Sequence, residues 1–137
     1  MTEGHPGAAI LLDQYRAMVA SDTEGVVRHF ADEIYYEEPS LGVVAHTPDE
    51  VARVYQPWFD YVDFTFPTLD AFGSQRRAAL RWEMHGTIRK EMPEVLPPDA
   101  VGKSFTLVGV TVAEFDGGLR IVRCGCYWDR GSLTRQF

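Results

Sequence analysis

The order of the predicted elements places this chain in the α+β class, as one curved antiparallel sheet with helices on one face. Helical patterns come first, a short strand and a further helix follow, and a run of long strands fills the second half. The 137 residues suit a single domain over residues 1–137. Hydrophobic residues make up 45% and charged residues 24%, which is typical of a globular protein with a sizeable core.

Two helices are predicted near the N-terminus. Pro6 suits the first turn of a helix over residues 6–20, in which apolar residues recur at loosely helical spacing. Ser21 and Glu24 then fit a capping box, with Ser21 as the cap of a second, shorter helix.

The third helix has the strongest local signal in the chain. Thr47 is a favourable N-cap, Pro48 takes the first helical position, and Glu50 completes a capping box. One face of this helix is strongly apolar and must pack on a sheet or wall a pocket. Its members are Val51, Val54, Tyr55, Trp58, Phe59 and Val62.

The strands are predicted from alternating side chains and from the turns between them. A short strand over residues 34–38 stops at Pro39. Pro67 indicates an edge position or a bulge in the first long strand. The long strands cover residues 64–72, 77–90, 103–115 and 119–129, with a Pro-rich loop over residues 92–102 and a tight turn at residues 116–118.

Charge and composition exclude several classes of function. The net charge is -7 and no run of Lys or Arg occurs, which argues against nucleic-acid binding. The N-terminus lacks a signal-peptide pattern, and no apolar run approaches the roughly 20 residues that span a membrane. We therefore expect a cytoplasmic protein that makes no contact with a membrane.

The sequence also predicts chemistry without a metal or a cofactor. Cys124 and Cys126 would share one strand face about 7 Å apart, too far for a relaxed disulfide, so we expect free thiols. His5, His29 and His46 are isolated from one another, and no phosphate-binding or dinucleotide-binding motif is present. Catalysis would then be acid/base chemistry by side chains alone.

Polar side chains alternate along one face of three predicted strands. If the sheet curls, its concave face could hold these groups in a pocket, and Asp129, which closes an otherwise half-apolar strand, is the best candidate acid/base. The three faces carry Tyr35 and Glu37, then Arg81, Glu83 and His85, and then Arg123, Tyr127 and Asp129.

Simpler interpretations stay open for the same residues. Leu80, Trp82 and Met84 would then face the core, leaving the polar face of their strand in solvent. In the same way, Glu37 would be a solvent-facing strand residue, and Asp129 would be a surface carboxylate or the ion-pair partner of Arg130 or Arg135. In the curled geometry, by contrast, Trp82 and Met84 would lie on the convex face and contact a second subunit.

These features together resemble the SnoaL-like polyketide cyclase group of the NTF2-like (ketosteroid isomerase-like) superfamily, over about residues 8–137. The features that match are Tyr35 to Pro39, the helix from Thr47, Arg81-Trp82 with Gly86-Thr87, Gly102-Lys103, the turn at Asp116, and Tyr127 to Asp129 with Leu133 and Gln136. The resemblance implies a cone-shaped α+β barrel with an apolar pocket between sheet and helices, commonly dimeric through the sheet. It also implies an acid/base aspartate near the end of the chain, the place that Asp129 takes.

The chain is also similar to limonene epoxide hydrolase. The Tyr-x-Asn, Arg-x-Asp and Asp pattern of that enzyme maps onto Tyr35-x-Glu37, Arg81-x-Glu83 and Asp129. Glu37 stands in place of the amide and Glu83 in place of the middle aspartate, which puts water activation by that triad in doubt.

The first functional hypothesis is a cofactor-independent cyclase or isomerase that closes a ring in an apolar, polyketide-like small molecule of secondary metabolism. Its candidate catalytic residues are Asp129, Glu83, Arg81, His85, Tyr35 and Glu37. Asp129 would be the acid/base, with its pKa raised by burial among aromatic rings. Arg81 or His85 would stabilise the developing oxyanion, Tyr35 would orient a substrate oxygen, and Glu83 would hold Arg81 or act as a second acid/base.

Substrate contacts are expected from Trp58, Tyr127, Tyr15 and Phe59. The alternatives are an epoxide hydrolase or epoxide-opening cyclase that uses the same residues, and a small-molecule-binding module without catalysis. The expected partners are an apolar small molecule and a second copy of the chain, which would form a homodimer through the outer face of the sheet.

Overall fold

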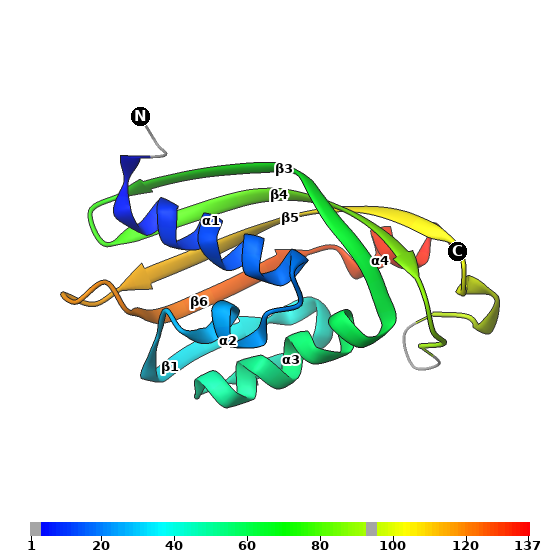
Figure 1. Ribbon diagram of the computed structural model, residues 1–137, viewed down its shortest axis with the longest axis horizontal. Coiled ribbons are helices and arrows are strands. Elements are labelled where there is room, and N and C mark those ends of the chain that lie inside the picture. The colour runs from blue at the N-terminus through cyan, green and yellow to red at the C-terminus, as the bar shows by residue number, and fades with distance from the viewer. Residues whose placement is uncertain (1–3, 93–95) are drawn as a thin grey trace.

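The computed structural model describes residues 4–92 and 96–137. Part of the predicted domain 1–137, and residues 93–95 of the predicted loop, lie outside the described residues. Figure 1 shows a strongly curved sheet with α1, α2 and α3 gathered on one side of it. The helices are α1 (Pro6–Val19), α2 (Thr23–Val27), α3 (Pro48–Tyr61) and α4 (Arg130–Thr134), with short 3-10 turns at η2 (Pro39–Leu41) and η3 (Pro98–Ala100).

Six strands form one sheet in the order β2-β1-β6-β5-β4-β3. They are β1 (Phe30–Glu38), β2 (Val43–Ala45), β3 (Val62–Ser74), β4 (Arg77–Ile88), β5 (Ser104–Phe115) and β6 (Ile121–Trp128). The predicted α+β class with a curved sheet is confirmed. The sheet is not wholly antiparallel, however, because β1 pairs with β6 in parallel. A parallel pair needs a long connection, and here the chain between the two strands builds the rest of the sheet.

The helices cover the apolar face of the sheet. In β4 the burial alternates, with Leu80, Trp82 and Met84 buried and Arg81 and His85 exposed. The simpler interpretation of this strand is therefore the correct one. Neither Trp82 nor Met84 is available for contact with a second subunit, because both lie under the helices rather than on the convex face.

The caps and the bulge agree with the sequence patterns in all but one place. Thr47 Oγ1 accepts a hydrogen bond from the backbone N–H of Glu50 at 3.2 Å, as predicted for α3. The register of β3 against β4 shifts around Pro67, where a bulge was expected. The cap of α2 is Asp22 and not Ser21, because Ser21 takes a left-handed backbone with φ 53°. No helix in the described part of the chain has both the length and the apolar character needed to span a bilayer.

Candidate functional site

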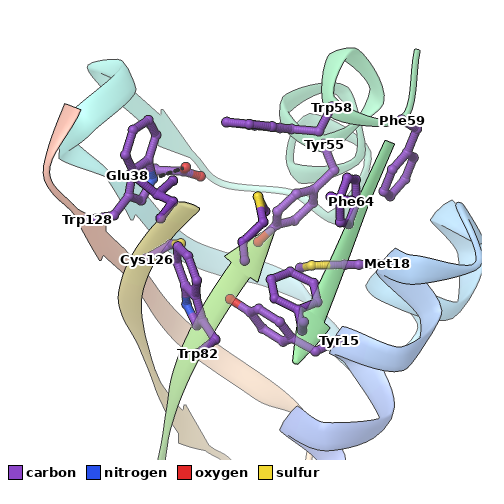
Figure 2. A pocket seen from close by; sticks show the side chains of 13 residues that line it. Tyr15, Met18, Glu38, Tyr55, Trp58, Phe59, Phe64, Trp82, Cys126 and Trp128 are labelled. Atoms are coloured by element: carbon purple, nitrogen blue, oxygen red, sulfur yellow. Dashed lines mark hydrogen bonds between the residues drawn. The ribbon is translucent and has the colours of Figure 1, made fainter. Parts of the chain in front are cut away.

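A pocket lies between the concave face of the sheet and the helices α1 and α3 (Figure 2). The free space among its side chains is about 410 Å³, which includes the mouth, whereas the centre of a water molecule can occupy only about 30 Å³. The pocket is therefore open to solvent but narrow. Its lining consists of Tyr15, Met18, Glu38, Tyr55, Trp58, Phe59, Phe64, Phe66, Trp82, Met84, Leu107, Cys126 and Trp128.

Aromatic rings make up most of the wall. Tyr15, Trp58 and Phe59 lie in the lining, where the sequence predicted contacts with a substrate. Tyr15 comes from α1, and the other two come from the apolar face of α3. Tyr127, the fourth predicted contact, is 42% exposed and lies outside this lining. An apolar small molecule with ring character suits such a wall.

Glu38 is the carboxylate in this lining. It is the last residue of β1 and is only 3% exposed. Tyr36 Oη donates to Glu38 Oε1 at 2.5 Å, and Trp128 Nε1 donates to Glu38 Oε2 at 2.8 Å. Burial raises the pKa of Glu38, and the two donors oppose that rise because they stabilise the ionised form. A carboxyl group whose pKa is raised in this way keeps its proton to a higher pH than a carboxyl group in water does.

A second hydroxyl links Glu38 to the opposite wall. Tyr36 Oη lies 3.1 Å from Tyr55 Oη, and the hydroxyl of Tyr55 points from α3 toward the middle of the pocket (Figure 2). Burial holds the pKa of both tyrosines well above the ordinary value. Both hydroxyls therefore stay protonated and can act as neutral hydrogen-bond donors.

A second polar cluster involves Tyr15 and Trp82, which also line the pocket. The hydroxyls of Tyr15 and Thr111 share a short hydrogen bond, and Trp82 Nε1 donates to Thr111 Oγ1 at 3.2 Å. Cys126 lies beside them as a buried free thiol whose pKa is raised by burial. Burial also raises the pKa of Tyr15, so the cluster carries no charge near neutral pH.

The polar face of β4 does not reach the pocket. Arg81 and His85 are exposed, and Glu83 pairs with His85 at 3.6 Å on the outer side of the sheet. The expectation that this face lines a cavity under the helices is wrong, because the apolar residues of the strand occupy that position. Burying those large apolar side chains is worth about 1.5–3 kcal/mol each, which decides which face turns inward.

The polar groups of β1 and β6 meet on the same outer face. Tyr127 Oη donates to Glu37 Oε2 at 2.9 Å, and the guanidinium of Arg123 lies 4.6 Å from the ring centre of Tyr35. The structure thus brings Tyr35, Glu37 and Tyr127 together, as expected, but not in the pocket. Glu37, Arg123 and Tyr127 line a small depression of the outer surface.

Asp129 has a structural role in place of the expected catalytic position. It is the N-cap of the short helix α4, where Asp129 Oδ1 accepts from the backbone N–H of Gly131 at 2.9 Å. Its other oxygen pairs with Arg135 at 3.3 Å, and its side chain is 68% exposed. The ion pair with Arg135 is one of the alternatives left open by the sequence. The Tyr-Arg-Asp pattern shared with limonene epoxide hydrolase is therefore not assembled in the pocket.

The sequence contains a pattern that indicates burial of Glu38, although Glu38 was not among the predicted site residues. Ile34, Tyr36 and Glu38 alternate on one face of β1, and the first two are buried. A carboxylate in line with two buried positions, just before Pro39 ends the strand, is a candidate for burial. Among residues 4–92 and 96–137, no cluster of His, Cys, Asp and Glu has the arrangement of a metal site.

Solved structures show the same architecture. The chain matches a candidate polyketide cyclase of Xanthomonas campestris with a TM-score of 0.84 and 17% identity, over 95% of each chain. A candidate polyketide cyclase of Pseudomonas putida matches with a TM-score of 0.82 and 16% identity, over 97% of this chain and 98% of that one. IdmH, a candidate polyketide cyclase of Streptomyces antibioticus, matches with a TM-score of 0.77 and 21% identity, over 93% and 95%.

At these identities the likeness establishes the fold alone, which is the NTF2-like fold named for other matching structures from Burkholderia. No curated protein sequence matches the chain. The family of SnoaL-like domains matches residues 11–124, which span α2, α3, the greater part of α1 and most of the sheet. The chain belongs to the SnoaL-like domain family.

Proposed function

We propose that this protein is a cofactor-independent acid/base catalyst of the cyclase or isomerase type, and that Glu38 is its acid/base. Its substrate is an apolar, oxygenated small molecule with ring character. The observation that carries the proposal is the placement of Glu38, a carboxyl group buried in an aromatic pocket and hydrogen-bonded on both oxygens. Membership of the SnoaL-like family and the fold shared with candidate polyketide cyclases support the same class of reaction.

The chemistry begins with proton transfer at a carbon next to a carbonyl group. Glu38 removes or returns that proton, since burial brings the pKa of its carboxyl toward the working pH. The aromatic rings hold the carbon skeleton, and the hydroxyls of Tyr15 and Tyr55 lie in the lining to contact its oxygen atoms. Ring closure follows when the resulting enol attacks a second carbonyl of the same molecule.

The test uses a small enolisable ketone, because the cavity is narrow. Exchange of the α-hydrogens of cyclopentanone for deuterium is followed by NMR in D₂O. Glu38→Gln should lower the protein-dependent rate by about 100-fold or more, the range of general acid/base catalysis. Glu37→Gln is the matched control, since the neighbouring carboxylate faces the outer surface and should leave the rate unchanged.

Retention of the exchange rate in Glu38→Gln, or no exchange above solvent by the unaltered protein, would contradict the assignment. Binding without turnover is the alternative, and it would show as quenching of Trp58 and Trp128 fluorescence by the ketone without any exchange.

The homodimer expected through the outer face of the sheet stays a prediction. That face exposes Val108, Val110 and Val112 of β5, an apolar row that a second copy would cover. Sedimentation of the protein and of a Val110→Lys variant would test it, with loss of the dimer expected in the variant.

A further inference from the structure

Three polar side chains are linked by hydrogen bonds. The two outer ones line the pocket, whereas the middle one is buried behind the lining. Glu38 and Tyr55 both belong to the lining, on different elements, and Tyr36 joins them. Tyr36 is fully buried, with no exposed surface, and does not belong to the lining. A proton can therefore pass between the two ends along hydroxyl groups without entering solvent.

The direction of this chain depends on the charge of Glu38. An ionised carboxylate can only accept, so Tyr36 gives its single proton to Glu38 Oε1. Tyr36 must then accept from Tyr55, which leaves Tyr55 with no proton to offer to the pocket. In this state the hydroxyl of Tyr55 can act only as an acceptor toward a ligand.

A proton on Glu38 reverses the chain. Trp128 Nε1 is a donor only, and it donates to Oε2, which makes Oε2 the carbonyl oxygen of the neutral acid. The acidic proton then lies on Oε1, next to Tyr36. Oε1 donates to Tyr36, Tyr36 donates to Tyr55, and Tyr55 donates into the pocket.

We propose that Tyr36 and Tyr55 form a proton relay that lets Glu38 act on two atoms of one substrate, a carbon beside it and a carbonyl oxygen beside Tyr55. Tyr55 is the catalytic acid at the oxygen, and Tyr36 is the positioning residue that couples it to Glu38. This proposal rests on the proposed function of Glu38 and deepens it. The substrates it selects are enolisable ketones whose oxygen must gain a proton as the α-hydrogen leaves.

The protons balance within the site. The substrate oxygen takes the proton of Tyr55, Tyr55 takes that of Tyr36, and Tyr36 takes that of Glu38. The carboxylate left behind removes the α-hydrogen as the C–H bond breaks, and its electron pair forms the C=C bond of the enol. Glu38 ends neutral, as it began, and no other reactant is consumed.

The surroundings of Glu38 allow its charge to control the relay. The titratable groups that face it are Tyr36 of its own strand, Tyr55 of α3, and the thiols of Cys124 and Cys126 on β6. Burial raises the pKa of all four, to about 12 for Cys124, so they stay uncharged near neutral pH. Within this cluster Glu38 is the group with the lowest ordinary pKa, which burial raises, so it is the one that changes charge first as pH rises.

Two probes separate the relay from simple proton removal. Cyclopentanone needs a proton on its oxygen as its α-hydrogen leaves. Nitroethane needs only a base, since its nitronate anion is stable at neutral pH without a proton on oxygen. With the unaltered protein, ketone exchange should fall as pH rises through the pKa of Glu38, because it needs the neutral acid, whereas nitroethane exchange should rise.

The variants Tyr55→Phe and Tyr36→Phe break the relay at one end and in the middle. Each should slow ketone exchange by about 10-fold to 100-fold, while nitroethane exchange on its high-pH plateau stays within about 3-fold. The double variant should be no slower than either single one, because the residues act as a unit. Tyr127→Phe is the matched control, as Tyr127 forms the same bond with Glu37 on the outer face and should change neither rate.

Equal loss with both probes would mean that the tyrosines only support the fold, and no loss with either would also overturn the relay. The proposed function fails separately, if Glu38→Gln keeps both rates or if the unaltered protein exchanges neither probe. In that case the carboxyl pKa of Glu38, measured by ¹³C NMR, still tests whether Tyr36 and Tyr55 are coupled to Glu38. Tyr36→Phe and Tyr55→Phe should each raise this pKa, and no rise in the Tyr55→Phe variant would show that Tyr55 is not coupled to Glu38.

Discussion

Replacing Trp128 by Phe tests the electrostatic account of the pocket. The change removes the indole N–H that donates to Glu38 Oε2 at 2.8 Å and keeps an aromatic ring in the wall. A hydrogen bond to a charged acceptor is worth about 1.5–3 kcal/mol, and one pKa unit corresponds to about 1.4 kcal/mol. The pKa of Glu38 in the folded protein should therefore rise by roughly 1–2 units in the variant.

The pH dependence of stability follows from the sign of this shift. The folded-state pKa of Glu38 is already raised, so the folded protein binds the proton more tightly than the unfolded chain, and stability falls as pH rises from the unfolded pKa through the folded one. Because the folded-state pKa of Glu38 is higher in the variant, the fall in its stability continues to a higher pH. Its free energy of unfolding should thus be lowered by about 1.5–3 kcal/mol more at pH 9 than at pH 4, beyond any packing loss common to both.

Urea unfolding at the two pH values, for both proteins, measures this difference. The same substitution in a Glu38→Gln background should lose the same stability at pH 4 and pH 9, because the titrating group is gone. In a Glu37→Gln background the pH dependence should persist. An equal loss at both pH values in the otherwise unaltered protein, or a pH dependence that survives Glu38→Gln, would refute the reasoning.

Three further outcomes are expected. Asp129→Ala should lower the free energy of unfolding by about 0.5–1 kcal/mol through loss of the cap of α4 and leave ketone exchange unchanged, so a large loss of exchange would restore its catalytic assignment. Gly109→Ala should lower the free energy of unfolding by about 1–3 kcal/mol, because the added Cβ would overlap the ring of Trp82. An unchanged urea midpoint would show that the Trp82 ring moves aside without cost. Cys124 and Cys126 should resist a thiol reagent in the folded protein and react once urea unfolds it, because burial raises the pKa of both thiols and closes access to them.

The sequence alone determined the class of fold and the two faces of each strand. Alternation is a local property, so the division of β4 into Leu80, Trp82 and Met84 against Arg81, Glu83 and His85 follows from the backbone period. The caps of α3 and the apolar stripe that brings Trp58 and Phe59 to the pocket are local in the same way. These features were predictable because each depends on neighbours within a few residues.

Only the tertiary structure decided which face turns inward and which carboxylate is buried. The parallel pairing of β1 with β6 joins residues about 90 apart in sequence, and it is this pairing that brings Trp128 to Glu38. No local pattern encodes that contact, because its free energy depends on the apolar area buried under the helices as a whole. Glu38 becomes an acid/base candidate through its buried surroundings, whereas the otherwise similar carboxyl group of Asp129 stays in water and caps a helix.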